Sequence, residues 1–269
     1  MVRVGVVGAA GRMGRTTCMA IQAADDLELV GAVDPAAAGK DLSELLDTAA
    51  PALAVTGGME TLAAEGVEVA VDFSVADGIA ERLEFYAEHG VHAVVGTTGI
   101  PASVLRDARR LFERSSANAI VAPNFALGAA LLMRFCELAA PHMDGVEIIE
   151  LHHDAKIDAP SGTALHIAEA IAFARQAEVA GPFTPDPTEE VTLDGARGGS
   201  GPLDIHVHSV RLPGLVAHHE VIFGAAGQTL TIRHDSFDRS SFMPGVLLAV
   251  RQVRNRPGLT VGLGPLLSS

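Results

Sequence analysis

The residues best suited to chemistry lie in the segment 150–163, which reads ELHHDAKIDAPSGT. It brings two imidazoles, His152 and His153, close to the ammonium group of Lys156. Adjacent residues of an extended strand point to opposite faces, so the two histidines should not do the same job. We expect one to act as a general acid at a cleft, because imidazole is easily poised near neutral pH, and the other to orient substrate or to pack.

Lys156 stands out because the chain has only one other lysine, Lys40, among many arginines. A surface lysine is the plain alternative. Arginine cannot usefully release its proton, whereas lysine can. We therefore interpret Lys156 as a proton donor.

A helix is predicted to begin at the Ser-Gly-Thr turn, because an apolar run with helical spacing follows it. Ser161 and Thr163 are both candidates for its cap, with Pro160 just ahead. A helix start presents free backbone N–H groups and the positive end of the helix dipole, which can hold a carboxylate or a phosphate. The segment thus predicts a site for a small acidic substrate.

At the N-terminus, a strand at 2–7 is followed by the turn GAAGRMG, residues 8–14, and a helical run from Arg15 to about Ala24. A dinucleotide fold requires this order: the first glycine makes the turn, the second admits a pyrophosphate and the third allows close helix packing. The spacing is G-x-x-G-x-x-G, and a tight turn in any α/β protein is the alternative. We predict cofactor binding.

Asp34 ends a second strand, Leu27 to Val33, about twenty positions beyond the glycines. An acidic residue at this position normally binds the hydroxyl groups of the adenine ribose. A loop aspartate before Pro35 is the alternative. No arginine follows to meet a 2′-phosphate, which favours NADH over NADPH. Arg12 and Arg15 could still supply positive charge near phosphates.

Three further apolar strands, near 67–73, 91–95 and 119–122, end in small or polar residues. In a doubly wound sheet such ends line the ligand crevice, so Thr97, Thr98 and Asn124 are candidates for the nicotinamide half. Residues 36–66 predict one short helix and an irregular strand. The fold class is α/β, with a Rossmann-like domain at 1–125, completed by the C-terminal helix at about 235–269.

Residues 126–234 have a different character and predict an α+β domain with a mixed sheet. An apolar helix at 126–140 precedes a strand at 146–151, and alternating strands follow near 205–210, 218–223 and 229–233. A Pro- and Gly-rich loop is expected at 180–202. His206, His208, His218 and His219 show no carboxylate or cysteine at ligand spacing, so we interpret them as structural and predict no metal site.

The formal net charge of −14 argues against nucleic acid or an anionic membrane as the main partner. No apolar run is long enough to span a bilayer, and the glycine-interrupted start is unlike a signal peptide. Cys18 and Cys136 give no disulfide framework, which suits a reducing compartment. We expect a cytoplasmic protein.

The chain resembles the 4-hydroxy-tetrahydrodipicolinate reductase family of diaminopimelate and lysine biosynthesis along nearly its whole length. The resemblance rests on GAAGRMG (8–14), GTTG (96–99), APNF (122–125) and above all the segment 150–163. Members reduce a cyclic dicarboxylate, with loss of water, and form homotetramers through the sheets of the second domain. Pro35 departs from members that use NADPH well, which can carry an arginine there.

The resemblance also implies individual roles. His152 would exchange a proton at the active site, Lys156 would donate one, and the substrate carboxylate would be bound by His153, Ser161, Gly162 and Thr163. The NADH or NADPH cofactor would be bound by Gly8, Ala9, Ala10, Gly11, Arg12, Met13, Asp34, Gly96, Thr97, Thr98, Ala122, Pro123, Asn124 and Phe125.

Two other classes share the N-terminal pattern. A semialdehyde dehydrogenase would need a nucleophilic cysteine at the cleft, whereas Cys18 and Cys136 fall in apolar helical runs. A non-catalytic NADH-binding redox sensor would have no use for His152 and Lys156.

Overall fold

The computed structural model describes residues 1–46 and 52–267. The chain forms two units: unit 1 is Met1–Phe125 with Phe242–Ser269, and unit 2 is Ala126–Ser241. The chain leaves unit 2 later than the expected position near 235, because the last strand of that unit continues to Ser236.

Unit 1 is built on a parallel sheet of seven strands in the order β12-β6-β5-β4-β1-β2-β3. The strands are β1 (Val2–Val7), β2 (Leu27–Val33), β3 (Val55–Thr56), β4 (Val69–Asp72), β5 (His92–Val95), β6 (Ala119–Val121) and β12 (Leu259–Val261). The central strands are mostly apolar and mostly buried, as expected for a parallel sheet covered on both faces. The predicted Rossmann-like fold is confirmed.

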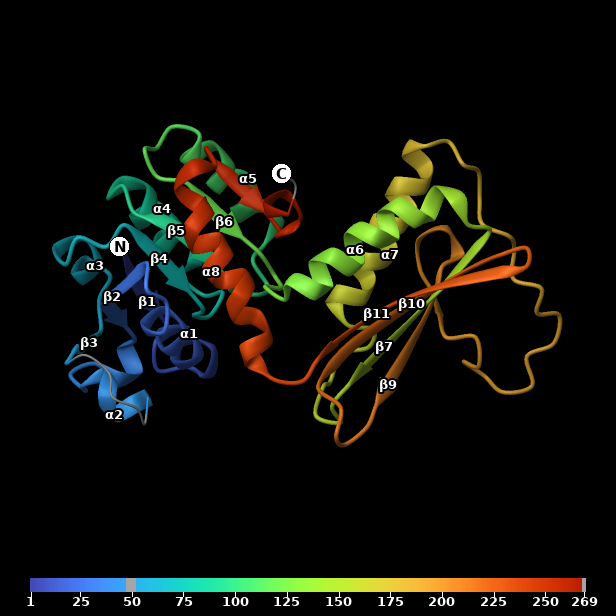
Figure 1. The fold of residues 1–269 in the computed structure, drawn as a ribbon, viewed down its shortest axis with the longest axis horizontal. Coiled ribbons are helices and arrows are strands. Elements are labelled where there is room, and N and C mark those ends of the chain that lie inside the picture. Colours follow the sequence, from blue (N-terminus) through green and yellow to red (C-terminus); the bar gives the residue numbers. More distant parts are fainter. Residues whose placement is uncertain (47–51, 268–269) are drawn as a thin grey trace. The chain divides into compact units, whose positions relative to one another are not determined.

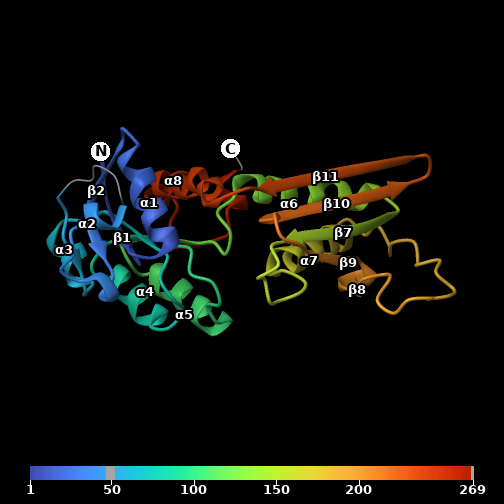
Figure 2. The same cartoon turned by 90° about the horizontal axis from the view of Figure 1, so that it is seen from below.

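Helices cover both faces of this sheet. They are α1 (Arg12–Gln22), α2 (Leu42–Leu46), α3 (Glu60–Ala64), α4 (Ile79–Glu88), α5 (Ala102–Phe112) and α8 (Met243–Gln252). Figure 2 shows α1 and α8 on one face and α4 and α5 on the other. Where one helix and one strand were predicted between 36 and 66, the structure has α2, β3 and α3, and residues 47–51 of that stretch lie outside the described residues.

The glycine turn brings α1 very close to β1. Gly8 has a φ of +77°, which favours glycine. A Cβ atom on Gly14 would lie 2.0 Å from the carbonyl oxygen of Gly8, so only glycine fits at this position. The close helix packing predicted for the third glycine is present.

Unit 2 pairs two helices with a mixed sheet (Figure 1). The strand order is β11-β10-β7-β9-β8, which can be followed in Figure 2. The strands are β7 (Gly145–His152), β8 (Gly199–Ser200), β9 (His206–Arg211), β10 (Ala217–Ala225) and β11 (Gln228–Ser236), and the helices are α6 (Leu127–Ala139) and α7 (Gly162–Ala177). The β7–β9 pair is parallel and the other pairs are antiparallel. Ile148 and Val221 pack with residues of α6 and α7 in one core. The predicted mixed sheet is confirmed.

Over residues 1–46 and 52–267, the chain contains no helix with the length and apolar character that crossing a bilayer would need.

Replacing Gly14 by alanine tests the close approach at the turn. We expect Gly14→Ala to lower the free energy of unfolding by about 3 kcal/mol, because the neighbouring atom is backbone and cannot rotate away. Gly145→Ala is the matched control, since a Cβ there meets nothing within 4 Å. Urea unfolding of both variants measures the difference, and equal stabilities would contradict the packing account.

Candidate functional site

A groove of about 500 Å³ opens at the carboxyl ends of the strands of unit 1. Gly8, Gly11 and Asp34 line it, together with Pro35 and Phe73. A Cβ on Gly11 would lie 3.2 Å from the carbonyl oxygen of Gly8, so glycine at this position allows the turn to be tight. The residues therefore fit a dinucleotide, with its phosphates at the turn and the start of α1.

Asp34 lies in this groove with its carboxylate already oriented. One oxygen accepts a hydrogen bond from the backbone N–H of Ala10 at 2.9 Å and the other accepts one from Ala36 at 3.0 Å. The bond to Ala10 ties the end of β2 to the glycine turn. The side chain is half-buried, so it remains accessible to a ligand.

The remaining predicted cofactor residues of unit 1 differ in exposure. Ala9, Thr97, Ala122 and Phe125 are buried, whereas Arg12, Thr98 and Pro123 are exposed, and Ala10, Met13, Gly96 and Asn124 lie between. The hydroxyl of Thr97 donates to the carbonyl oxygen of Ser74 at 3.1 Å. Phe125 packs edge-on against Phe73, with ring centroids 5.7 Å apart. Thr97 and Phe125 therefore contact Ser74 and Phe73, which line the groove.

A buried carboxylate that the sequence did not single out braces the same rim. Asp72, at the end of β4, accepts hydrogen bonds from the Ser74 N–H at 2.9 Å, Arg82 Nε at 2.8 Å and the Tyr86 hydroxyl at 3.0 Å. Arg82 also donates to the carbonyl oxygens of Val75 and Asp77. The loop that lines the groove is thus held in place by one arginine.

In unit 2, polar side chains of the segment 150–163 and of neighbouring strands surround Glu150. We call Glu150, His152, Ser161, Arg211 and His219 the Glu150 cluster. Glu150 is fully buried and accepts two hydrogen bonds from Arg211, at 2.7 and 2.8 Å. It also accepts one from His152 Nδ1 at 2.5 Å and one from the Ser161 N–H at 3.1 Å.

Burial and the hydrogen bonds of the cluster shift the pKa values of Glu150 and His152. Burial raises the pKa of Glu150, but the hydrogen bonds from Arg211, Ser209 and His152 outweigh it and hold the pKa at about 2. Burial lowers the pKa of His152, and the Glu150 carboxylate works against that shift. His152 is thus a buried imidazole next to a permanent negative charge.

His219 completes the cluster from β10. Its Nε2 lies 3.1 Å from the hydroxyl of Ser161, which itself accepts a hydrogen bond from the Ala164 N–H at 3.2 Å. The Ser161 proton is therefore free to point to His219. Burial, together with a smaller effect of the nearby His152, lowers the pKa of His219 to about 4, so the ring is neutral at pH 7. Ser161 is confirmed as the cap of α7.

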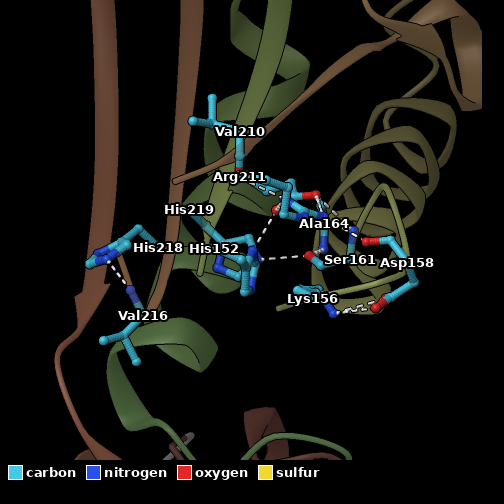
Figure 3. A network of polar contacts seen from close by, with 11 residues as sticks. His152, Lys156, Asp158, Ser161, Ala164, Val210, Arg211, Val216, His218 and His219 are labelled. Atoms are coloured by element: carbon cyan, nitrogen blue, oxygen red, sulfur yellow. Dashed lines mark hydrogen bonds and ion pairs between the residues drawn. The ribbon is translucent and has the colours of Figure 1, made fainter. Parts of the chain in front are cut away.

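The other predicted residues of the segment are arranged around this cluster. His153 is exposed while His152 is buried, in keeping with the expected alternation. The Lys156 ammonium pairs with both oxygens of Asp158 at 2.8 Å. Gly162 and Thr163 form the first turn of α7, with Gly162 exposed. Figure 3 shows His152, Lys156 and Ser161 together beside the start of α7.

Three of the four histidines interpreted as structural have carboxylate partners from distant parts of the chain. His208 lies 2.7 Å from Glu147, His218 lies 2.7 Å from Asp235 and His206 lies 3.2 Å from Asp186. The partners come from other strands or from the loop before β8, so spacing along the chain could not reveal them. Within the described residues, no group of three or more side chains could hold a metal ion.

Sequence reasoning missed Glu150, Arg211 and His219 as members of the site. Glu150 could have been found, because it lies two residues before His152 and therefore on the same face of the strand. Arg211 could not, because only the pairing of β7 with β9, which sets it opposite His152, brings it there.

A Rossmann-like unit with a glycine turn, joined to a second unit that carries an imidazole and an ammonium beside a helix start, defines a two-domain oxidoreductase that uses a pyridine nucleotide. The family model Dihydrodipicolinate reductase, N-terminus, matches residues 2–125, and Dihydrodipicolinate reductase, C-terminus, matches residues 128–267. The chain belongs to the dihydrodipicolinate reductase family.

Individual relatives agree with this assignment. The 4-hydroxy-tetrahydrodipicolinate reductase of Nocardia farcinica is 52% identical, covering 99% of this chain and 98% of its own. That of Mycolicibacterium vanbaalenii is 48% identical, covering 99% of both chains. A dipicolinate-bound dihydrodipicolinate reductase from Paenisporosarcina sp. TG-14 superposes with a TM-score of 0.87 at 39% identity, covering 99% of this chain and 100% of its own.

The competing classes are not favoured. An amine dehydrogenase from Mycobacterium smegmatis shares only the fold, with 16% identity and a TM-score of 0.61 over 98% of this chain and 95% of its own. Burial raises the pKa of the Cys18 and Cys136 thiols to about 12, so neither is a ready nucleophile.

The neutral state of His219 predicts a pH dependence of stability. Its pKa is about 4 in the folded chain and 6.5 ordinarily, so between these values the unfolded chain binds the extra proton. The stability that the neutral His219 ring contributes is fully present above about pH 6.5 and is lost as the pH falls to about 4. Over this range the free energy of unfolding falls by up to ~1.4 kcal/mol per pH unit. We expect His219→Gln to lose less unfolding free energy than wild type between pH 7.5 and 4.5.

Urea unfolding at fixed protein concentration measures this difference. His142→Gln, at an exposed histidine, is the control and should behave as wild type. If His219→Gln showed the same loss between the two pH values as wild type, the buried neutral ring would not be the cause.

Proposed function

We propose that the chain reduces 4-hydroxy-tetrahydrodipicolinate to tetrahydrodipicolinate, with loss of water, in diaminopimelate and lysine biosynthesis. The observation that carries the proposal is the match to both halves of one reductase family along the chain, with the Glu150 cluster in the second half. A relative at 39% identity was solved with dipicolinate, itself a small dicarboxylate.

The groove of unit 1 would hold the nicotinamide cofactor. The backbone of Gly8 to Met13 would take its phosphates and Asp34 its adenine ribose, with Gly96 to Thr98 and Ala122 to Phe125 toward the nicotinamide half. When bound, the reduced cofactor supplies the hydride for C4 of the substrate ring.

The start of α7 would hold a substrate carboxylate. Ser161 already caps this helix, so the N–H groups of Gly162 and Thr163 remain for a ligand, and the exposure of Gly162 supports this. His153, exposed just before the loop, would contribute to the same carboxylate. A local positive site of this kind explains how an acidic protein binds a dianion.

His152 and Lys156 would supply the proton that leaves with the 4-hydroxyl group as water. Reduction adds a hydride to the ring, and the departing hydroxyl needs a proton. His152 donates through Nδ1 to Glu150, so Nε2 is the nitrogen able to exchange a proton with substrate. The Lys156 ammonium, half-buried beside it, is the second acid.

We further propose that NADH is preferred over NADPH, because the Asp34 carboxylate faces the groove and Pro35 follows it. The chain would assemble as a homotetramer through the sheet of unit 2. Ile148 and Val221 face α6 and α7, so alternate residues such as Glu147 and Glu220 lie on the other face, which a partner could cover. The two free thiols, Cys18 and Cys136, agree with a cytoplasmic location.

A spectrophotometric assay of NADH oxidation with enzymatically generated 4-hydroxy-tetrahydrodipicolinate tests the proposal. We expect turnover that depends on both reactants. NADH binding without oxidation would favour the redox-sensor alternative.

His152→Ala and Lys156→Ala should each lower kcat on the order of 10²-fold or more while NADH still binds, because each removes a proton donor but leaves unit 1 intact. The matched controls are His142→Ala and Lys40→Ala, an exposed histidine and the other lysine of the chain. Steady-state kinetics and a fluorescence titration with NADH separate the two effects. Unchanged turnover in either site variant would remove that residue from the mechanism.

Asp34→Ala should weaken NADH binding more than NADPH binding, by about tenfold in the ratio of the dissociation constants, because a charged acceptor for the ribose hydroxyls is lost. Both cofactors will also lose the support that Asp34 gives Ala10. Asp77→Ala, in the same groove, should leave the ratio unchanged. Calorimetric titration of the two cofactors decides, and an equal loss in Asp34→Ala would refute the ribose role.

A further inference from the structure

We infer that Glu150 and Arg211 are positioning residues: together they fix the ring orientation and the proton-bearing nitrogen of His152 and lock it to the helix start at Ser161. The inference rests on the proposed function for its catalytic meaning. Its geometry is independent of that proposal.

Glu150 is saturated by protein donors. Oε2 accepts from His152 Nδ1 and from Arg211 Nη1, while Oε1 accepts from Arg211 Nη2 and from the Ser161 N–H. A carboxylate offers about four lone-pair sites, so none is left for substrate. Glu150 must therefore act through the groups it binds.

The hydrogen bond to His152 settles the tautomer. Because a carboxylate only accepts, the Nδ1 atom of His152 must carry the proton. Nε2 is then unprotonated in the neutral ring and gains the proton that can be transferred. The same carboxylate holds the cap of α7, so the acid and the anion-binding turn keep a fixed spacing.

Arg211 extends this control to the loop that carries Lys156. Its Nη2 donates to the carbonyl oxygen of Asp158 at 2.6 Å, and the Asp158 side chain pairs with the lysine. The Arg211 guanidinium thus connects the two proposed proton donors, through the Glu150 carboxylate to His152 and through Asp158 to Lys156. The guanidinium also compensates the buried charge of Glu150.

Glu150 and Arg211 shift the pKa of His152 in opposite directions. Glu150 raises the pKa of His152, whereas Arg211 and Lys156 lower it. His219 of β10 also lies beside the ring, with ring centroids 5.4 Å apart, and it is itself influenced by His218 and His234. Asp158 of the loop pairs with Lys156. Removing the carboxylate should therefore lower the pKa of His152, and removing the guanidinium should raise it.

Histidine ¹⁵N NMR across a pH titration tests the inference on the full chain without substrate. In wild type we expect the neutral His152 ring to carry its proton on Nδ1. Glu150→Gln should move the pKa of His152 down and Arg211→Gln should move it up. A neutral ring protonated at Nε2 in wild type, or shifts of the same sign in the two variants, would overturn the inference.

The kinetic readout is the pH profile of kcat. We expect kcat of Glu150→Gln to fall on the order of 10²-fold. The limb of the pH profile that is assigned to His152 should move in the same direction as the pKa measured by NMR. NADH binding should be unchanged. A loss of kcat with an undisplaced limb would mark Glu150 as merely structural and would contradict the inference.

Two further variants keep the test decisive. If Arg211→Gln does not fold, because it leaves a buried carboxylate unpaired, the double variant Glu150→Gln/Arg211→Gln removes both charges and should place the His152 pKa between wild type and Glu150→Gln. Glu147→Gln is the matched control: Glu147 lies on the same strand, on the opposite face, and binds His208 and Arg197. It should leave the His152 titration unchanged.

Failure of this inference and failure of the proposed function are distinguishable. Absence of NADH oxidation in wild type would refute the function and leave the NMR result standing. Wild-type turnover combined with Nε2 protonation in the resting enzyme would refute the positioning role alone.

Discussion

The polar part of unit 2 is arranged around the buried carboxylate of Glu150. Burying an isolated carboxylate is very costly, so Glu150 can be accommodated only where donors surround it. Those donors come from three places: the same strand, the parallel neighbour β9 and the start of α7. The strand register and the end of the loop are thereby fixed by the chemistry of a single side chain. His152 and Ser161 are held in position by their hydrogen bonds to Glu150.

In unit 1, backbone contacts position the segment that would bind an anion. The close contact of Gly14 with Gly8 brings the start of α1 against the end of β1, and Asp34 ties the turn to β2. Asp72 then braces the neighbouring loop through Arg82. In both units a buried or half-buried carboxylate holds the segment that would bind an anion, while backbone N–H groups at a helix start remain for the ligand.

The elements that depend on local pattern could be predicted from the sequence. The apolar strands before Gly8 and Gly96, the cap at Ser161 and the divergence of His152 from His153 all follow from spacing along the chain. Long-range partners could not be predicted, since strand pairing brings Arg211 to Glu150 and Asp235 to His218. The short strand β12, which joins the sheet beside β6, was also missed, because three residues carry too little periodicity.

The most direct test of the account is a crystal structure of the chain with NADH and dipicolinate. The account predicts a ligand carboxylate on the N–H groups of Gly162 and Thr163, with the ring beside Nε2 of His152 and Glu150 still bound to Arg211. Dipicolinate bound elsewhere, with the start of α7 free of ligand, would contradict the claim that this helix start was built to hold the substrate.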